Sequence, residues 1–178
     1  MTRGPPYKSG CIQYIQNRFS LLNRSIDSRL EKYLLDEDIK LIPYQVIDRG
    51  QLTGSVFEGI WMLREGDLRI GRSDWIPEKL EIISEWVKKS LSPIAKSLGI
   101  TIGQLSIAWA LHQKFMGFVI VGVTNPNYIS INLKADKIKL SSETILALDR
   151  VYDDLVSEIK QKYNLTIREF RGLNEKYY

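Results

Sequence analysis

Polar and aromatic residues end two short apolar runs of this sequence. Gln16 and Asn17 follow the run that begins at Ile12, and Tyr44 ends the run that begins at Lys40. Side chains at the carboxyl ends of parallel strands point into the crevice where α/β proteins bind ligands. Tyr44 could stack there on a flat ligand, or it could be a core ring with a satisfied hydroxyl. Gln16 and Asn17 could equally belong to an ordinary strand-ending turn.

Two turns add hydrogen-bond donors at the same strand ends. The Asp48–Gly50 turn follows the second run and contains a glycine and an arginine. After a third run, residues 118–121, Thr124 and Asn125 are suited to cap a helix that begins with Pro126. Free backbone N–H groups of that helix would favour an anion. A capped helix after a buried strand is also typical of many α/β proteins, so both interpretations stay open.

Amphipathic segments must position these turns. Between residues 101 and 114 apolar residues recur at helical spacing, and Thr101 with Gln104 forms a capping box. Further helices are predicted at about 25–38, capped by Ser25 or Asp27, at 77–98, ended by Gly99, and from Ser141 onward.

The alternation of short strands and helices predicts an α/β fold. Continuous apolar runs at 12–16, 40–44 and 118–121 are typical of parallel strands, and right-handed crossovers would make them adjacent. Residues 55–76 lack periodicity, which is typical of a functional or mobile loop. Residues 1–9 are predicted to form an irregular leader, and residues from about 151 to 178 a surface helix with a frayed tail.

Composition limits the classes of function. The chain has 178 residues and 44% hydrophobic residues, enough for a single domain with a core. A net charge of +4 is spread among alternating signs, so no nucleic-acid partner is expected. No apolar run approaches the ~20 residues of a membrane span, and no signal peptide is visible, so we expect a cytoplasmic protein. One cysteine and one histidine exclude an intramolecular disulfide and a soft-ligand metal cluster.

Six motifs together resemble, in order and spacing, the C-terminal half of an aldo/keto reductase. The likeness covers roughly residues 10–150 of a single partial domain, with 151–178 as a C-terminal extension. It implies a partial (β/α)₈ TIM barrel made of its last three parallel strands, their helices and a C-terminal helical tail. The motifs are IQYIQNRFSLLNR, LIPYQVIDRGQLTG, EGDLR, LGITIGQLSIAWAL, GVTNPNYISINL and KLSSETILALD.

The resemblance also implies a binding site for NADP or NAD. Gln16 would hydrogen-bond the nicotinamide carboxamide, and Tyr44 would stack on the nicotinamide ring. The adenine would lie beside Asn132. The pyrophosphate would be bound by Gln45, Ile47, Arg49 and Gly50. The adenosine phosphate would be bound by the turn containing Gly122, Thr124 and Asn125.

Departures from the family pattern change these expectations. Gln45 and Val46 replace the usual Ser-Pro, and Thr124 replaces an arginine of the last phosphate turn. We therefore expect little preference for NADP over NAD. The family's catalytic Asp, Tyr, Lys and His have no counterpart, and His112 lies in an apolar helix.

No catalytic residue is therefore assigned, and the chain alone is expected to be inactive. A complementary chain that supplies the missing strands, or self-association, would be needed for an active enzyme. The alternatives are a non-catalytic nucleotide-binding or regulatory module and a truncated remnant without function. The opening MTRGPPYKSG, directly before a strand, favours truncation.

Overall fold

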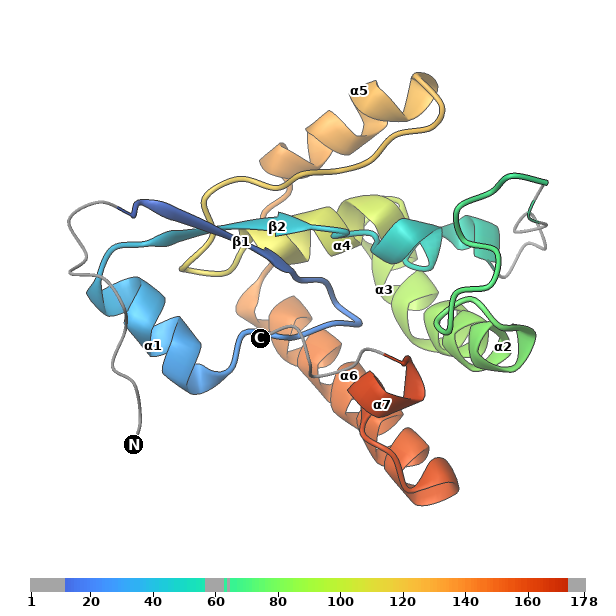
Figure 1. The fold of residues 1–178 in the computed structure, drawn as a ribbon. Coiled ribbons are helices and arrows are strands. Elements are labelled where there is room, and N and C mark those ends of the chain that lie inside the picture. Colours follow the sequence, from blue (N-terminus) through green and yellow to red (C-terminus); the bar gives the residue numbers. More distant parts are fainter. Residues whose placement is uncertain (1–11, 57–62, 64, 173–178) are drawn as a thin grey trace.

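The computed structural model describes residues 12–56, 63 and 65–172 (Figure 1). The predicted leader, residues 1–9, lies outside this part of the chain. The elements are β1 (Tyr14–Arg18), α1 (Ser28–Asp36), β2 (Lys40–Tyr44), the short turns η1 (Asp48–Gly50) and η2 (Gly54–Val56), α2 (Pro77–Trp86), a π-helical turn η3 (Val87–Leu91), α3 (Ser92–Ser97), α4 (Ile102–Leu111), α5 (Asn127–Leu133), η4 (Lys134–Lys137), α6 (Ser142–Tyr163) and α7 (Ile167–Phe170).

Two parallel strands, β1 and β2, form the sheet of the described residues. Gln16 pairs with Ile42 and Arg18 with Tyr44, so β1 is shifted two residues along the chain from the strand predicted at residues 12–16. Gln16, predicted at the end of this strand, lies in its middle. The connecting helix α1 begins as expected, because the Asp27 side chain accepts a hydrogen bond of 2.8 Å from the backbone N–H of Leu30. The βαβ unit therefore forms as predicted.

The prediction of a third strand at residues 118–121 is wrong for this structure. The preceding residues do run parallel to β2: Leu41 donates to the Phe115 carbonyl at 2.8 Å and accepts from Gly117 at 2.9 Å. Pro43 has no N–H and cannot donate the next ladder bond. The ladder resumes only where Ile120 donates to the Pro43 carbonyl at 3.0 Å, and a single bridge between Leu41 and Met116 is formed.

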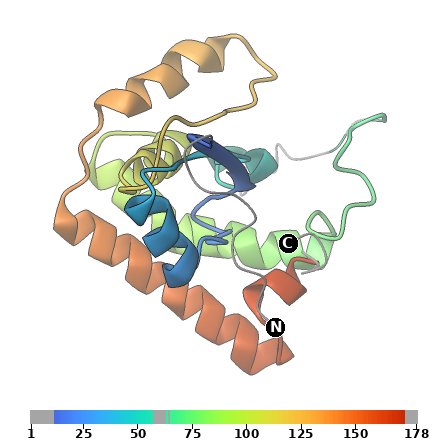
Figure 2. The ribbon, with the colours of Figure 1, turned by 60° about the vertical axis from the view of Figure 1, so that its left-hand side comes forward.

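The helices enclose one hydrophobic core. α2, η3 and α3 continue one another, and α4 begins at the predicted capping box of Thr101 and Gln104. Trp109 of α4 stacks on Phe19, which follows β1, with ring centroids 5.2 Å apart. α5 and α6 lie on opposite sides of the sheet in both views (Figures 1 and 2). α5 also contacts α4 directly, since the Gln104 side chain donates to the Ile131 carbonyl at 2.9 Å.

No single helix in the described ranges is long and apolar enough to cross a membrane. One bent pair, Pro77–Ser97 with Ile102–Leu111, satisfies length and composition together at an angle of 79°. Both members of this pair contribute buried side chains to the core, including Leu91 and Leu105.

The helix predicted from about residue 151 is present as the continuation of α6, and one face of it is buried. Leu155 and Ile159 of α6 are buried, and so are Ile167 and Phe170 of α7. α6 ends at Tyr163, and the left-handed backbone of its C-cap, Asn164, lets α7 fold back (Figure 1). The buried faces of α6 and α7 therefore belong to the core.

Candidate functional site

Gln16 and Tyr44 share one face of the sheet. Residues that pair across parallel strands point the same way, and the register pairs Gln16 with Ile42 and Arg18 with Tyr44. The opposite face carries Ile15 and Leu41, which pack in the core. Tyr44 is 39% exposed, so it is not the core ring that was one alternative. Its ring stands at the carboxyl end of β2, where the sequence placed it.

The turn after β2 has an unusual backbone. Gln45, Asp48 and Arg49 have φ values of 59°, 51° and 55°, and Gly50 has 97°. The left-handed region costs a non-glycine residue about 1–2 kcal/mol. Backbone bonds from Gly50 and Leu52 to the Ile47 carbonyl, at 2.9 and 3.2 Å, close the turn. Such strain persists only where neighbouring groups hold the residues in place.

Ion pairs of the Asp48 carboxylate hold the turn in place. This carboxylate is fully buried and pairs with Arg18 of β1 and, at 2.9 Å, with Arg171 beyond α7. The Ser20 hydroxyl donates to it at 3.2 Å. Burial by itself would raise the pKa of the Asp48 carboxyl, but Arg171 and Arg18 outweigh it and keep this pKa below its usual value. Asp48 is thus a buried carboxylate at neutral pH.

A second buried carboxylate, that of Asp74, pairs with the other arginines around the turn. Its oxygens lie 3.3 Å from Arg18, 3.1 Å from Arg49 and 3.1 Å from Arg72. With Arg171, four arginines therefore face two aspartates, an excess of two positive charges. Burial, followed by repulsion from Arg72, lowers the pKa of the half-buried Arg49 guanidinium. An anion at this rim would offset the excess charge.

Of the residues predicted to hold the adenosine end, those before α5 lie at the end of the sheet that carries η1, whereas Asn132 lies near the C-terminal end of α5 (Figure 1). The segment containing Gly122, Thr124 and Asn125 is exposed and leads to the N-terminus of α5, on the side that carries η1 (Figure 1). Asn132 is half-buried on α5. The helix is assigned one residue later than predicted, with Pro126 at the N-cap, but the Asn125 side chain forms the expected capping bond and accepts from the N–H of Asn127 at 3.0 Å.

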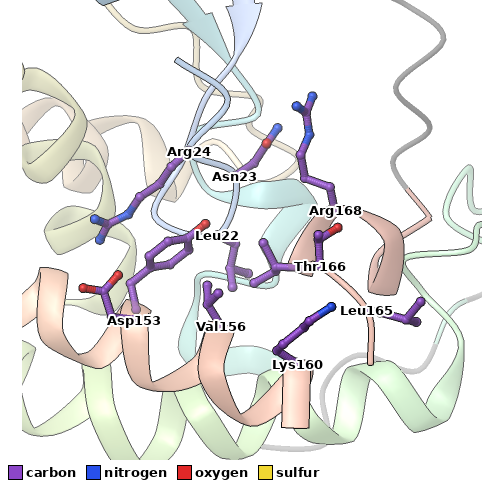
Figure 3. Close-up of a pocket in the computed structure, with 11 residues that line it drawn as sticks. Leu22, Asn23, Arg24, Asp153, Val156, Lys160, Leu165, Thr166 and Arg168 are labelled. Carbon is purple, nitrogen blue, oxygen red and sulfur yellow. The ribbon is translucent and has the colours of Figure 1, made fainter. Parts of the chain in front are cut away.

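A separate pocket of about 300 Å³ lies between the loop after β1 and the helices α6 and α7 (Figure 3). Arg24 in its wall is already engaged, since it pairs with Asp149 at 2.6 Å and donates to the Leu148 carbonyl at 3.2 Å. Its guanidinium also lies 4.0 Å from the centre of the Tyr152 ring. None of the predicted site residues lines this pocket. Among the described residues, no three His, Cys, Asp or Glu side chains are grouped to hold a metal ion.

Sequence reasoning missed most of the charged cluster. Arg18 follows the predicted strand and Asp74 lies in the aperiodic 55–76 segment, so neither has a local signal. Arg171 donates to Gln51 at 3.1 Å across 120 positions of the chain. No spacing rule connects residues so far apart, and only the fold brings them together.

The geometry defines an α/β domain with an exposed aromatic ring at the end of β2, an exposed amide in the middle of β1 and a cationic turn after β2. The family model described as Aldo/keto reductase family matches residues 8–153. The chain therefore belongs to the aldo/keto reductase family.

Curated relatives resemble it over most of its length. The NADH-specific methylglyoxal reductase of Escherichia coli is 25% identical over 142 residues, which are 74% of this chain and 39% of that protein. The aldo-keto reductase yakc of Schizosaccharomyces pombe, named for NADP(+), is 30% identical over 83% of this chain and 43% of its own length. The chain thus spans about two-fifths of the length of these relatives.

Solved structures support the fold. A glycerol dehydrogenase from Gluconobacter oxydans superposes with a TM-score of 0.66 at 21% identity, covering 80% of this chain and 43% of that one. A thermostable aldo-keto reductase in complex with epalrestat gives a TM-score of 0.54 at 23% identity, covering 78% and 39%.

Proposed function

We propose that this chain is the cofactor-binding half of an NAD(P)-dependent oxidoreductase of the aldo/keto reductase type. The observation that carries the proposal is the cationic turn. Arg49 lies beside Arg72 in a cluster with two excess positive charges, directly after the exposed Tyr44 ring. A dinucleotide offers both an aromatic ring and a pyrophosphate, which match these two features.

Each predicted residue has a role in this proposal. Tyr44 stacks on the nicotinamide ring, and Gln16, exposed on the same sheet face, holds its carboxamide. The pyrophosphate binds the turn of Gln45, Ile47, Arg49 and Gly50, and the adenosine end binds Gly122, Thr124, Asn125 and Asn132. When bound, the cofactor supplies a hydride for a carbonyl. The chain's own residues bind and orient it.

The proposal includes a partner that completes a TIM-type barrel. Within the described residues β1 pairs only with β2, so its other edge is unpaired, a liability in solution. Tyr14 of β1 and Phe118 are also 51% and 53% exposed, with ring centroids 5.9 Å apart. A complementary chain with the missing strands, or a second copy of this chain, would cover them. We place the assembly in the cytoplasm.

Titration of the purified chain with NADPH and with NADH tests the proposal. We expect saturable binding of one dinucleotide per chain, detected by quenching of tryptophan fluorescence. The two affinities should be similar, because Thr124 brings no charge to a 2′-phosphate. A preference above about tenfold for NADPH would contradict the role given to Thr124, since each tenfold is about 1.4 kcal/mol. No binding of either cofactor would refute the function.

Replacing Tyr44 tests the stacking role directly. Tyr44→Ala should weaken dinucleotide binding by about 1–3 kcal/mol, the range for loss of a stacking ring. Tyr44→Phe is the matched control and should bind almost as the wild type does, because it keeps the ring. Equal affinities of all three proteins in the same titration would show that the Tyr44 ring does not contact the ligand.

A further inference from the structure

We propose that Arg171, directly after α7, is a positioning residue for the Asp48–Gly50 turn. Dinucleotide affinity would then depend on a segment outside residues 8–153, the part that matches the family model. The inference rests on the proposed function only for its ligand. The ordering of the turn by Arg171 stands on the contacts themselves.

Arg171 contacts both ends of the turn. One terminal nitrogen, Nη1, lies 2.9 Å from Asp48 Oδ2, and the other, Nη2, donates to Gln51 Oε1 at 3.1 Å. Gln51 in turn donates to the Asp74 carbonyl at 2.6 Å. The Arg171 side chain is 2% exposed, so these contacts are shielded from water. The turn is therefore clamped from inside by one planar group, a geometry that favours arginine over lysine.

The clamp complements a second arginine. Arg18 contacts the Oδ1 oxygen of Asp48, whereas Arg171 contacts Oδ2, so both carboxylate oxygens are fixed. The contact of Arg171 is an ion pair without hydrogen-bond geometry, and with the Ser20 hydroxyl on the same oxygen it opposes rotation of the Asp48 side chain. Asp48 and Arg49 occupy the left-handed region, which is unfavourable for residues other than glycine. The contacts to the Asp48 carboxylate offset this conformational cost.

α7 is anchored independently of the Arg171 side chain. A capping box joins Thr166 and Glu169, and Phe170 is buried with its ring 5.1 Å from that of Tyr163. The Arg171 carbonyl also accepts a hydrogen bond of 3.4 Å from Ser73. A substitution at Arg171 should therefore remove the clamp without releasing the helix.

The test compares Arg171→Met with Arg24→Met in the full chain. Both variants remove an arginine–aspartate pair that joins the N-terminal half to the C-terminal helices, but only Arg171 touches the turn. We expect Arg171→Met to weaken NADPH and NADH binding about tenfold, within the range of couplings carried by a contacting residue. Arg24→Met should stay within about twofold of the wild type, because it is not in contact with the turn.

Hydrogen exchange separates this inference from the proposed function. The amides of Gly50, Gln51 and Leu52 should exchange faster in Arg171→Met than in Arg24→Met, with or without a ligand. If the wild type binds no dinucleotide, the proposed function fails. The exchange rates alone then test whether Arg171 orders the turn. Unchanged rates in the turn, or unchanged affinity where the wild type binds, would overturn this inference. If Arg171→Met does not fold, Arg171→Lys takes its place and must show the same faster exchange.

Discussion

The Asp48→Asn variant is expected to lose about 3 kcal/mol or more of the free energy of unfolding. Removing one partner of a buried ion pair leaves an uncompensated buried charge, which typically costs 3–5 kcal/mol. In this variant Arg18 and Arg171 lose their charged partner while their side chains stay buried, at 8% and 2% exposed. Asp74 remains near both, but it already faces Arg49 and Arg72. Denaturant unfolding at pH 7 measures the difference.

Asp149→Asn is the matched control for that measurement. It also removes an aspartate from an arginine pair, but Asp149 is 42% exposed and the pair lies nearer to water. Exposed pairs contribute at most about 1 kcal/mol. If Asp48→Asn is no more destabilising than Asp149→Asn, the buried cluster does not stabilise the fold as described.

The stabilisation by Asp48 should also depend on pH. Its pKa is lower in the folded chain than in the unfolded one, so its contribution is complete above the unfolded pKa of about 3.9. It is then lost as the pH falls through the folded pKa. The difference in stability between wild type and Asp48→Asn should therefore be constant at neutral pH and shrink below about pH 4.

The purified chain is expected to show no carbonyl reductase turnover with NADPH or NADH. Hydride transfer to a carbonyl builds negative charge on oxygen, and a positioned proton donor is typically worth 10²–10⁴-fold in rate. In the proposed site Tyr44 is committed to stacking and Arg49 to phosphate, so neither remains as the acid. From the sequence we expect no counterpart in this chain of the family residues that supply this proton. Cofactor oxidation with a generic aldehyde is the assay.

If a partner chain completes the barrel as proposed, mixing it with this chain should restore turnover. The mixture therefore serves as the positive control in the same assay. Saturable oxidation of NADPH by the chain alone would contradict this account and would place a proton donor among its own residues.

Local signals in the sequence predicted much of the fold. The Asp27 cap, the capping box at Thr101 and the bounds of β2 are set by neighbours in the chain, and all three are present. The strand expected at residues 118–121 failed for a non-local reason. It depended on Pro43, a residue of another segment, which cannot donate to the ladder.

The C-terminal segment contains an apolar helical pattern that is easily overlooked among its many charged residues. Leu148, Leu155 and Ile159 lie seven and four positions apart, which is the spacing of a buried helical stripe. That stripe predicts a buried face on α6, but it says nothing of Arg171. The exposed ring and the turn after β2 could be named from motifs, whereas the aspartates and arginines that hold the turn are assembled only by folding.

The most direct test of the dinucleotide site is a hydrogen-exchange footprint of the wild-type chain with and without NADPH. Bound cofactor should slow exchange in residues 45–52, around the Asp48–Gly50 turn, and leave the pocket beside Arg24 and Tyr152 unchanged. Protection confined to that pocket (Figure 3), or no protection at saturating NADPH, would contradict the assignment of the β2 turn as the cofactor site.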